Sequence, residues 1–141
     1  TNLAVILTQD DEIFVLTSQR SSIESEKRHI ANKVRAALEL GGAEVTSTDG
    51  YPAWEPNVNS EIVKLAAQVY EKMMGHAPRI EAIHAGLECG LVGEKYPGMD
   101  MISFGPNLFD VHTPFEKVQI SSVEKIWKFF VELLKNIPEN K

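Results

Sequence analysis

The residues best suited to chemistry include a group in the stretch HAGLECG, residues 84–90. It holds His84, Glu88 and Cys89, and histidine, carboxylate and thiolate groups all serve as zinc ligands. A glycine such as Gly86 also lets the backbone approach a ligand closely. The same stretch also fits a tight strand-to-helix turn that carries a buried thiol, and on spacing alone the zinc signal is weak, so the residues alone leave both interpretations open.

A second histidine, His112, lies in FDVHTPFEK, after an expected strand and before an expected helix. Loops at strand ends are where α/β proteins place functional groups, and Pro114 restricts the backbone just after the imidazole. His112 is therefore a candidate metal ligand, although a lone histidine also fits a structural role.

Arg20, in TSQRSS, is the candidate anion-binding residue. Its planar guanidinium matches a carboxylate or phosphate, and the neighbouring hydroxyls could add hydrogen bonds. A surface arginine at the start of a helix is the alternative. A hydrolytic zinc centre needs several ligands and a general base, so these residues by themselves do not complete an active site.

The elements that would position Arg20 form a ββαβ unit. Apolar runs at residues 3–7 and 13–16, separated by polar turn residues, predict a β-hairpin. Ser21 and Glu24 have the spacing of a capping box and predict that a helix starts there. Weak alternation over residues 43–48 predicts a third strand, which would give a sheet covered on one face by a helix.

A proline-containing break at residues 51–57 separates this unit from the rest of the chain. A helix follows, which Asn59 or Ser60 can cap and Gly75 can end.

Two strands, residues 79–83 and 100–104, then lead to a final helix with a second capping-box pattern at Ser121 and Glu124. This alternation of helices and strands predicts the α/β class. The apolar face expected for the last helix consists of Val123, Ile126, Trp127, Phe130, Leu133 and Leu134.

Composition excludes two kinds of partner. The 141 residues carry a net charge of −6, with only 14 Lys and Arg spread along the chain, so we expect no nucleic-acid binding. No apolar run approaches the roughly 18 residues of a membrane span, so we expect no membrane partner. One cysteine, Cys89, cannot form an internal disulfide, which is compatible with a reducing cytoplasm.

The order of motifs resembles one enzyme family. AIHAGLECG, then YPGMDMISFGPN, then HTP and a final amphipathic helix resemble the C-terminal part of aminoacyl-histidine dipeptidases, also called Xaa-His or cytosol nonspecific dipeptidases. These belong to the dinuclear zinc exopeptidases, in which a lid domain is inserted into an α/β catalytic domain. The resemblance implies a C-terminal fragment of a cytoplasmic zinc dipeptidase. Residues 1–55 would be the second half of the lid, and residues 56–141 would return into the catalytic domain.

The resemblance also implies roles for individual residues. His112 matches the last zinc ligand, Arg20 would pair with the C-terminal carboxylate of a dipeptide, and Gly86 matches a substrate-binding glycine. Glu88 would support this loop or the amine end of the substrate. The other ligands of the two zinc ions and the glutamate general base lie in a portion outside this chain, so no catalytic residue is expected here and the isolated chain is expected to be inactive. Phe115 departs from the family, which often has a small polar or acidic residue there.

The resemblance further implies a homodimer that forms through the lid. The alternative from another class is a non-catalytic module whose unpaired sheet edge drives self-association. His-x-Asp zinc motifs upstream in the parent reading frame would favour the enzyme.

Overall fold

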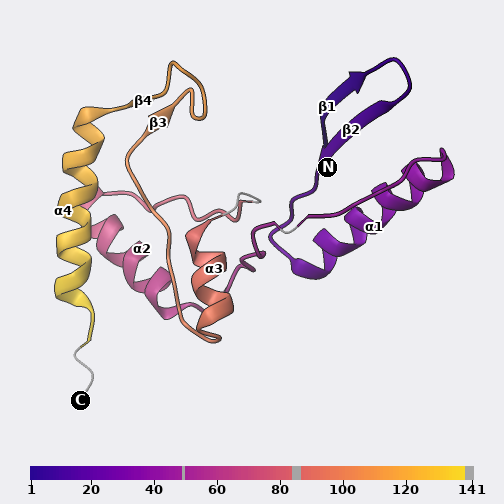
Figure 1. Cartoon of the computed structure of the whole chain (residues 1–141). Helices are drawn as coiled ribbons and strands as arrows, with labels where there is room; N and C mark the ends of the chain where they lie inside the picture. The colour runs from indigo at the N-terminus through magenta and orange to yellow at the C-terminus, as the bar shows by residue number, and fades with distance from the viewer. Residues whose placement is uncertain (49, 84–86, 139–141) are drawn as a thin grey trace. The chain divides into compact units, whose positions relative to one another are not determined.

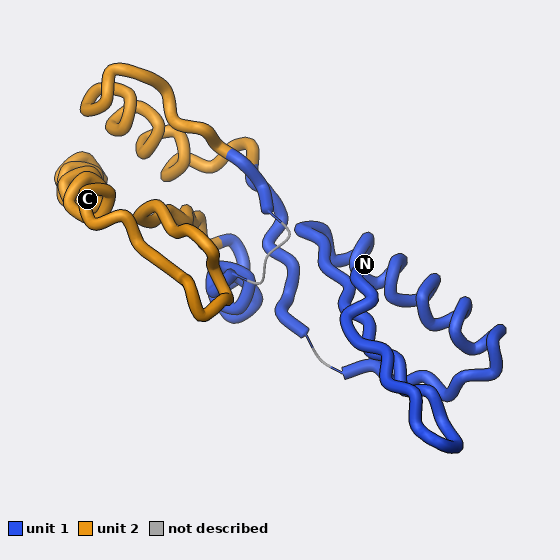
Figure 2. The backbone as a smooth tube through the Cα atoms, turned by 90° about the horizontal axis from the view of Figure 1, so that it is seen from above, with its two compact units in different colours: residues 1–57, 81–98 blue, residues 58–80, 99–141 orange. Residues whose placement is uncertain are grey.

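The computed structural model describes residues 1–48, 50–83 and 87–138. The chain folds into two compact units, Thr1–Asn57 with Glu81–Gly98 and Val58–Ile80 with Met99–Lys141 (Figure 2). The described chain contains helices and antiparallel strand pairs, in agreement with the expected α/β class (Figure 1). The division after Asn57 lies near the expected boundary at 55/56, whereas residues 81–98 group with the first unit. The assignment of the two regions to a lid and a catalytic domain remains a prediction.

The predicted hairpin is confirmed at the start of the first unit. Strand β1 (Asn2–Thr8) pairs antiparallel with β2 (Ile13–Ser18), and the Gln9 amide donates to the Glu12 carbonyl at 2.9 Å in the turn. The apolar side chains of the hairpin are largely exposed, namely Leu3, Ile6, Leu7, Ile13, Phe14 and Leu16.

Helix α1 (Glu24–Leu40) begins three residues later than its expected cap, and the predicted capping box at Ser21 is wrong. Ile23 precedes the first helical residue and makes no side-chain cap, while the Ser21 hydroxyl accepts from the Ile23 amide at 3.1 Å. Because Glu24 is itself the first helical residue, it is not at the third helical position that a capping box requires. The helix ends at Leu40, and Gly42 shortly after it takes the left-handed conformation at φ 86° that glycine tolerates.

The three remaining predicted strands, residues 43–48, 79–83 and 100–104, are wrong: in the described chain these residues form no strand. A strand requires a neighbour to complete its ladder of backbone hydrogen bonds, and none of these segments pairs with another in the part of the chain that the structure describes. Residues 43–48 are instead attached to α1, where the Arg35 guanidinium donates to the Val45 carbonyl at 2.9 Å.

Helix α2 (Glu61–Met74) opens the second unit and has both predicted ends. The Ser60 hydroxyl accepts from the Val63 amide at 3.1 Å, and Gly75 takes the left-handed conformation at φ 77°. Helix α4 (Ile120–Asn136) packs against α2 (Figure 1). The buried apolar core that they share is Ala66, Val69, Phe129 and Leu133.

The predicted apolar face of α4 is correct only in part. Leu133 is buried, but so is Phe129, which lay outside the predicted face, and Trp127 remains 62% exposed. Apolar side chains occur on two sides of this helix, and only one side meets α2. The predicted capping box at Ser121 and Glu124 is also wrong, because Gln119 precedes the helix without a side-chain cap.

The shorter elements carry the loops of interest. Helix α3 (Glu88–Lys95) follows the HAGL residues, and β3 (Leu108–Phe109) pairs antiparallel with β4 (Lys117–Val118) around the HTP loop. Among the helices of the described residues, none has the length and apolar character to cross a membrane.

Asp100 is expected to stabilise the start of α2, because its Oδ2 accepts from the Ile62 amide at 3.0 Å. That bond and the Ser60 hydroxyl lower the pKa of Asp100 below its ordinary value of 3.8. Its stabilisation is therefore present above the unfolded pKa and is lost as the pH falls through the folded pKa. Asp100→Ala should lower the free energy of unfolding by about 1 kcal/mol near neutral pH, as loss of a helix cap does. Urea denaturation would check this, with Asp100→Asn, which keeps an acceptor, as the milder control; equal stability of wild type and Asp100→Ala at neutral pH would contradict it.

Candidate functional site

His112 lies in the loop between β3 and β4, where the backbone is strained. Asp110 and His112 both have positive φ, 53° and 65°. For a residue other than glycine, this left-handed conformation costs about 1–2 kcal/mol. The loop therefore needs contacts that hold these two residues in place.

Side chains of the loop itself provide these contacts. The His112 amide donates to Glu116 Oε2 at 2.8 Å, and the Thr113 hydroxyl donates to the Asp110 carbonyl at 2.7 Å. Lys117 Nζ also lies 3.3 Å from Asp110 Oδ2. The His112 side chain is exposed on this internally bonded loop, so it is available to a ligand without a rearrangement of the backbone.

Glu116 is expected to maintain the conformation of His112. Glu116→Ala removes the acceptor of the His112 amide and should weaken protection of that amide by about 0.5–1.5 kcal/mol, the usual net value of one hydrogen bond. Glu116→Gln retains an acceptor oxygen and should restore most of the protection. Amide hydrogen exchange at His112 measures this, and identical exchange in the alanine variant and the wild type would remove Glu116 from this role.

Arg20 lies between β2 and α1 in the first unit, with an exposed side chain. No hydrogen bond or ion pair occupies its guanidinium among the described residues. The Ser21 hydroxyl beside it accepts from the Ile23 amide, a bond that leaves the hydroxyl hydrogen free to donate to an anion. The described chain thus leaves the guanidinium available to an anion.

The HAGLECG stretch is described only from Leu87 onward, so the predictions for His84 and Gly86 fall outside the described residues. Glu88 is the exposed first residue of α3. Cys89 is half-buried, and burial raises the pKa of its thiol. This partial burial is compatible with a thiol that packs inside the fold.

Gly90 has a packing role that the sequence did not reveal. It is buried, and a Cβ at this position would lie 2.6 Å from the Pro52 carbonyl oxygen. Real Cβ atoms do not come so close to a backbone oxygen, so α3 can approach Pro52 only with glycine here. The nearest signal in the sequence is the glycine itself.

The predicted site residues that the structure describes are distributed over both units. Arg20 and Glu88 belong to the first unit and His112 to the second. The described residues contain no group of three or more His, Cys, Asp and Glu side chains that could hold a metal ion. An open groove between α2 and α4, lined by residues that include Val69 and Trp127, contains none of the predicted site residues.

Comparison with known proteins gives consistent results. Residues 6–136 match the sequence pattern described as Peptidase family M20/M25/M40. Over 137 residues the chain is 38% identical to the cytosol non-specific dipeptidase of Escherichia coli K12, a match that covers 97% of this chain and 28% of that protein. The crystal structure of the aminoacylhistidine dipeptidase from Vibrio alginolyticus matches with a TM-score of 0.76 and 40% identity, over 99% of this chain and 29% of that one. The chain thus spans less than a third of the length of either relative.

Proposed function

The chain belongs to peptidase family M20/M25/M40, and we propose that it supplies the C-terminal part of a zinc-dependent dipeptidase that cleaves Xaa-His and other dipeptides with a free C-terminus. The observation that carries this proposal is the HTP loop, in which Glu116 holds the exposed His112 in a left-handed conformation. The names of the two relatives, both dipeptidases, support the substrate class.

His112 fits the role of a zinc ligand in its own chemistry. A neutral imidazole is a good zinc donor, and this one is exposed on a loop whose backbone is already held. Two zinc ions bound in the whole enzyme would polarise the peptide carbonyl and make water a nucleophile at neutral pH. We propose that His112 contributes one nitrogen to that centre, and that the remaining ligands and the general base come from outside this chain.

Three residues, Arg20, Glu88 and Gly86, are proposed to bind the substrate. The exposed guanidinium of Arg20 would pair with the C-terminal carboxylate and so select dipeptides over longer peptides. Glu88, exposed at the start of α3, would face the substrate's ammonium end or support its own loop. Gly86 would offer a backbone contact.

The direct test compares the full-length protein with the isolated chain. With zinc and an Xaa-His dipeptide, the full-length protein should release amino acids and a chelator should stop the release, since the water is activated by the metal. The 141-residue chain alone should release none, because it carries one proposed ligand whereas a catalytic zinc takes about three from the protein. Turnover by the isolated chain that survives repurification and disappears in His112→Ala would overturn this division of the site.

Homodimer formation through the lid and a cytoplasmic location are further parts of this proposal. The exposed apolar side chains of the β1–β2 hairpin support the dimer, because an exposed apolar strand pair is a surface for association. The name of the E. coli relative, a cytosol dipeptidase, supports the location. The same hairpin is what favours the alternative, a non-catalytic self-association module. A full-length protein that sediments as a dimer but hydrolyses no dipeptide would favour that alternative.

A further inference from the structure

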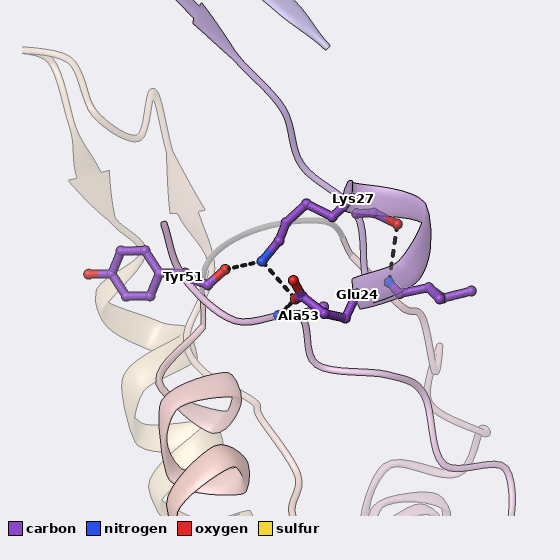
Figure 3. Close-up of polar contacts among 6 residues, drawn as sticks. Glu24, Lys27, Tyr51 and Ala53 are labelled. Atoms are coloured by element: carbon purple, nitrogen blue, oxygen red, sulfur yellow. Dashed lines mark hydrogen bonds and ion pairs between the residues drawn. The ribbon is translucent and has the colours of Figure 1, made fainter. Parts of the chain in front are cut away.

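The segment of residues 51–53, here called the connector, is attached to the first turn of α1 by a cluster of polar contacts (Figure 3). Lys27 Nζ lies 2.7 Å from Glu24 Oε2 and donates to the Tyr51 carbonyl at 2.8 Å. The Ala53 amide donates to the same Glu24 oxygen at 3.1 Å. One ion pair on α1 thus bonds both ends of the connector.

The middle of the connector contacts α3. Gly90 is buried against Pro52, and a Cβ at this position does not fit because it would lie 2.6 Å from the Pro52 carbonyl oxygen. The connector is therefore bonded on one side to α1 and packed on the other side against α3, all within the first unit.

A comparable ion pair on α2 shows what is particular to this cluster. Glu61 and Lys64 also lie three residues apart at the start of a helix, with their charged atoms 2.7 Å apart. Their side chains are 83% and 52% exposed, whereas Lys27 is 22% exposed. Among the described residues, Lys64 Nζ donates to no backbone carbonyl, in contrast to Lys27. The pKa of Glu24 lies below its ordinary value, mainly because of the hydrogen bond from Lys27 and also because of the one from the Ala53 amide.

We propose that the connector positions the substrate-binding residues, with Glu24, Lys27 and Gly90 as its positioning residues. Glu24 follows Arg20 by four residues, and Gly90 follows Glu88 by two. The connector therefore links the segment that carries Arg20 to the helix that starts with Glu88. Its catalytic consequence rests on the proposed dipeptidase function: the two segments must keep their spacing for a dipeptide to bind at both ends.

The test uses the full-length protein with the variants Lys27→Met and Gly90→Ala, and Lys64→Met as the matched control. A displaced binding group loses part of its hydrogen bonding to the substrate, so KM for a free dipeptide should rise roughly tenfold in both variants. The value of kcat and the bound zinc should stay unchanged, because the loss is one of substrate binding. The control should match the wild type. An unchanged KM in Lys27→Met, or an equal rise in Lys64→Met, would overturn the proposal.

Amide hydrogen exchange separates this inference from the proposed function. In Lys27→Met, exchange should accelerate at Ala53, in the residues around Arg20 and at the start of α3 together, whether or not the protein hydrolyses dipeptides. Faster exchange confined to residues 51–53 would show that the connector does not couple the two segments, and would overturn the proposal. If the wild-type protein hydrolysed no dipeptide, the proposed dipeptidase function would be wrong. The exchange result alone would then decide whether the connector couples the two segments. Lys27→Met keeps the test available if Gly90→Ala does not fold.

Discussion

His112→Ala in the full-length protein is expected to reduce bound zinc from two ions toward one per subunit and to lower kcat by at least about a hundredfold. Loss of a residue that only orients a ligand already costs 10–100-fold, so loss of a ligand itself should cost no less. The fold should remain, because His112 is exposed and contributes no core contact. Metal analysis, circular dichroism and steady-state kinetics on the same preparation measure the three quantities.

The matched control is His29→Ala, since His29 is an exposed histidine on α1 with no proposed role. This control should keep two zinc ions and normal turnover. If His112→Ala retained both ions and near-normal kcat, His112 would not be a ligand, and the strained HTP loop would need another explanation.

Arg20→Ala is expected to lower kcat/KM for free dipeptides by about 10–150-fold, the equivalent of the roughly 1.5–3 kcal/mol that a hydrogen bond to a charged group contributes. C-terminally amidated dipeptides lack the carboxylate, so the variant and the wild type should cleave them at similar, low rates. Arg20→Lys retains the charge but not the two parallel donors, and it should also be impaired.

Arg28→Ala provides the control for Arg20, because Arg28 is likewise exposed in the same unit and should leave kcat/KM unchanged. The comparison of free and amidated substrates decides the role. An equal loss on both in Arg20→Ala would mean that Arg20 acts on something other than the substrate carboxylate.

Local chemistry in the sequence was sufficient for several elements of the fold. The hairpin follows from two apolar runs around a polar turn, and α2 follows from a serine cap and a glycine that tolerates positive φ. These features involve residues close together in the chain, so their outcome does not depend on distant contacts. The candidate site residues were likewise identified from sequence motifs and family resemblance. For His112 the structure adds the hydrogen bond from its amide to Glu116, which holds the backbone of the loop.

The tertiary structure decided what depends on residues far apart in the chain. The pattern of α4 contains two apolar sides, and only its packing on α2 selects Phe129 and Leu133 for the core. Residues 43–48 have a strand-like pattern but lack a pairing partner in the described chain, so they form no strand. The spacing of Ser21 and Glu24 matches a capping box. In the folded chain, however, the Glu24 carboxylate accepts from the Ala53 amide of the connector, 29 residues later. A sequence pattern specifies which groups need partners, whereas only the folded chain brings a distant partner within the few ångströms over which hydrogen bonds and packing act.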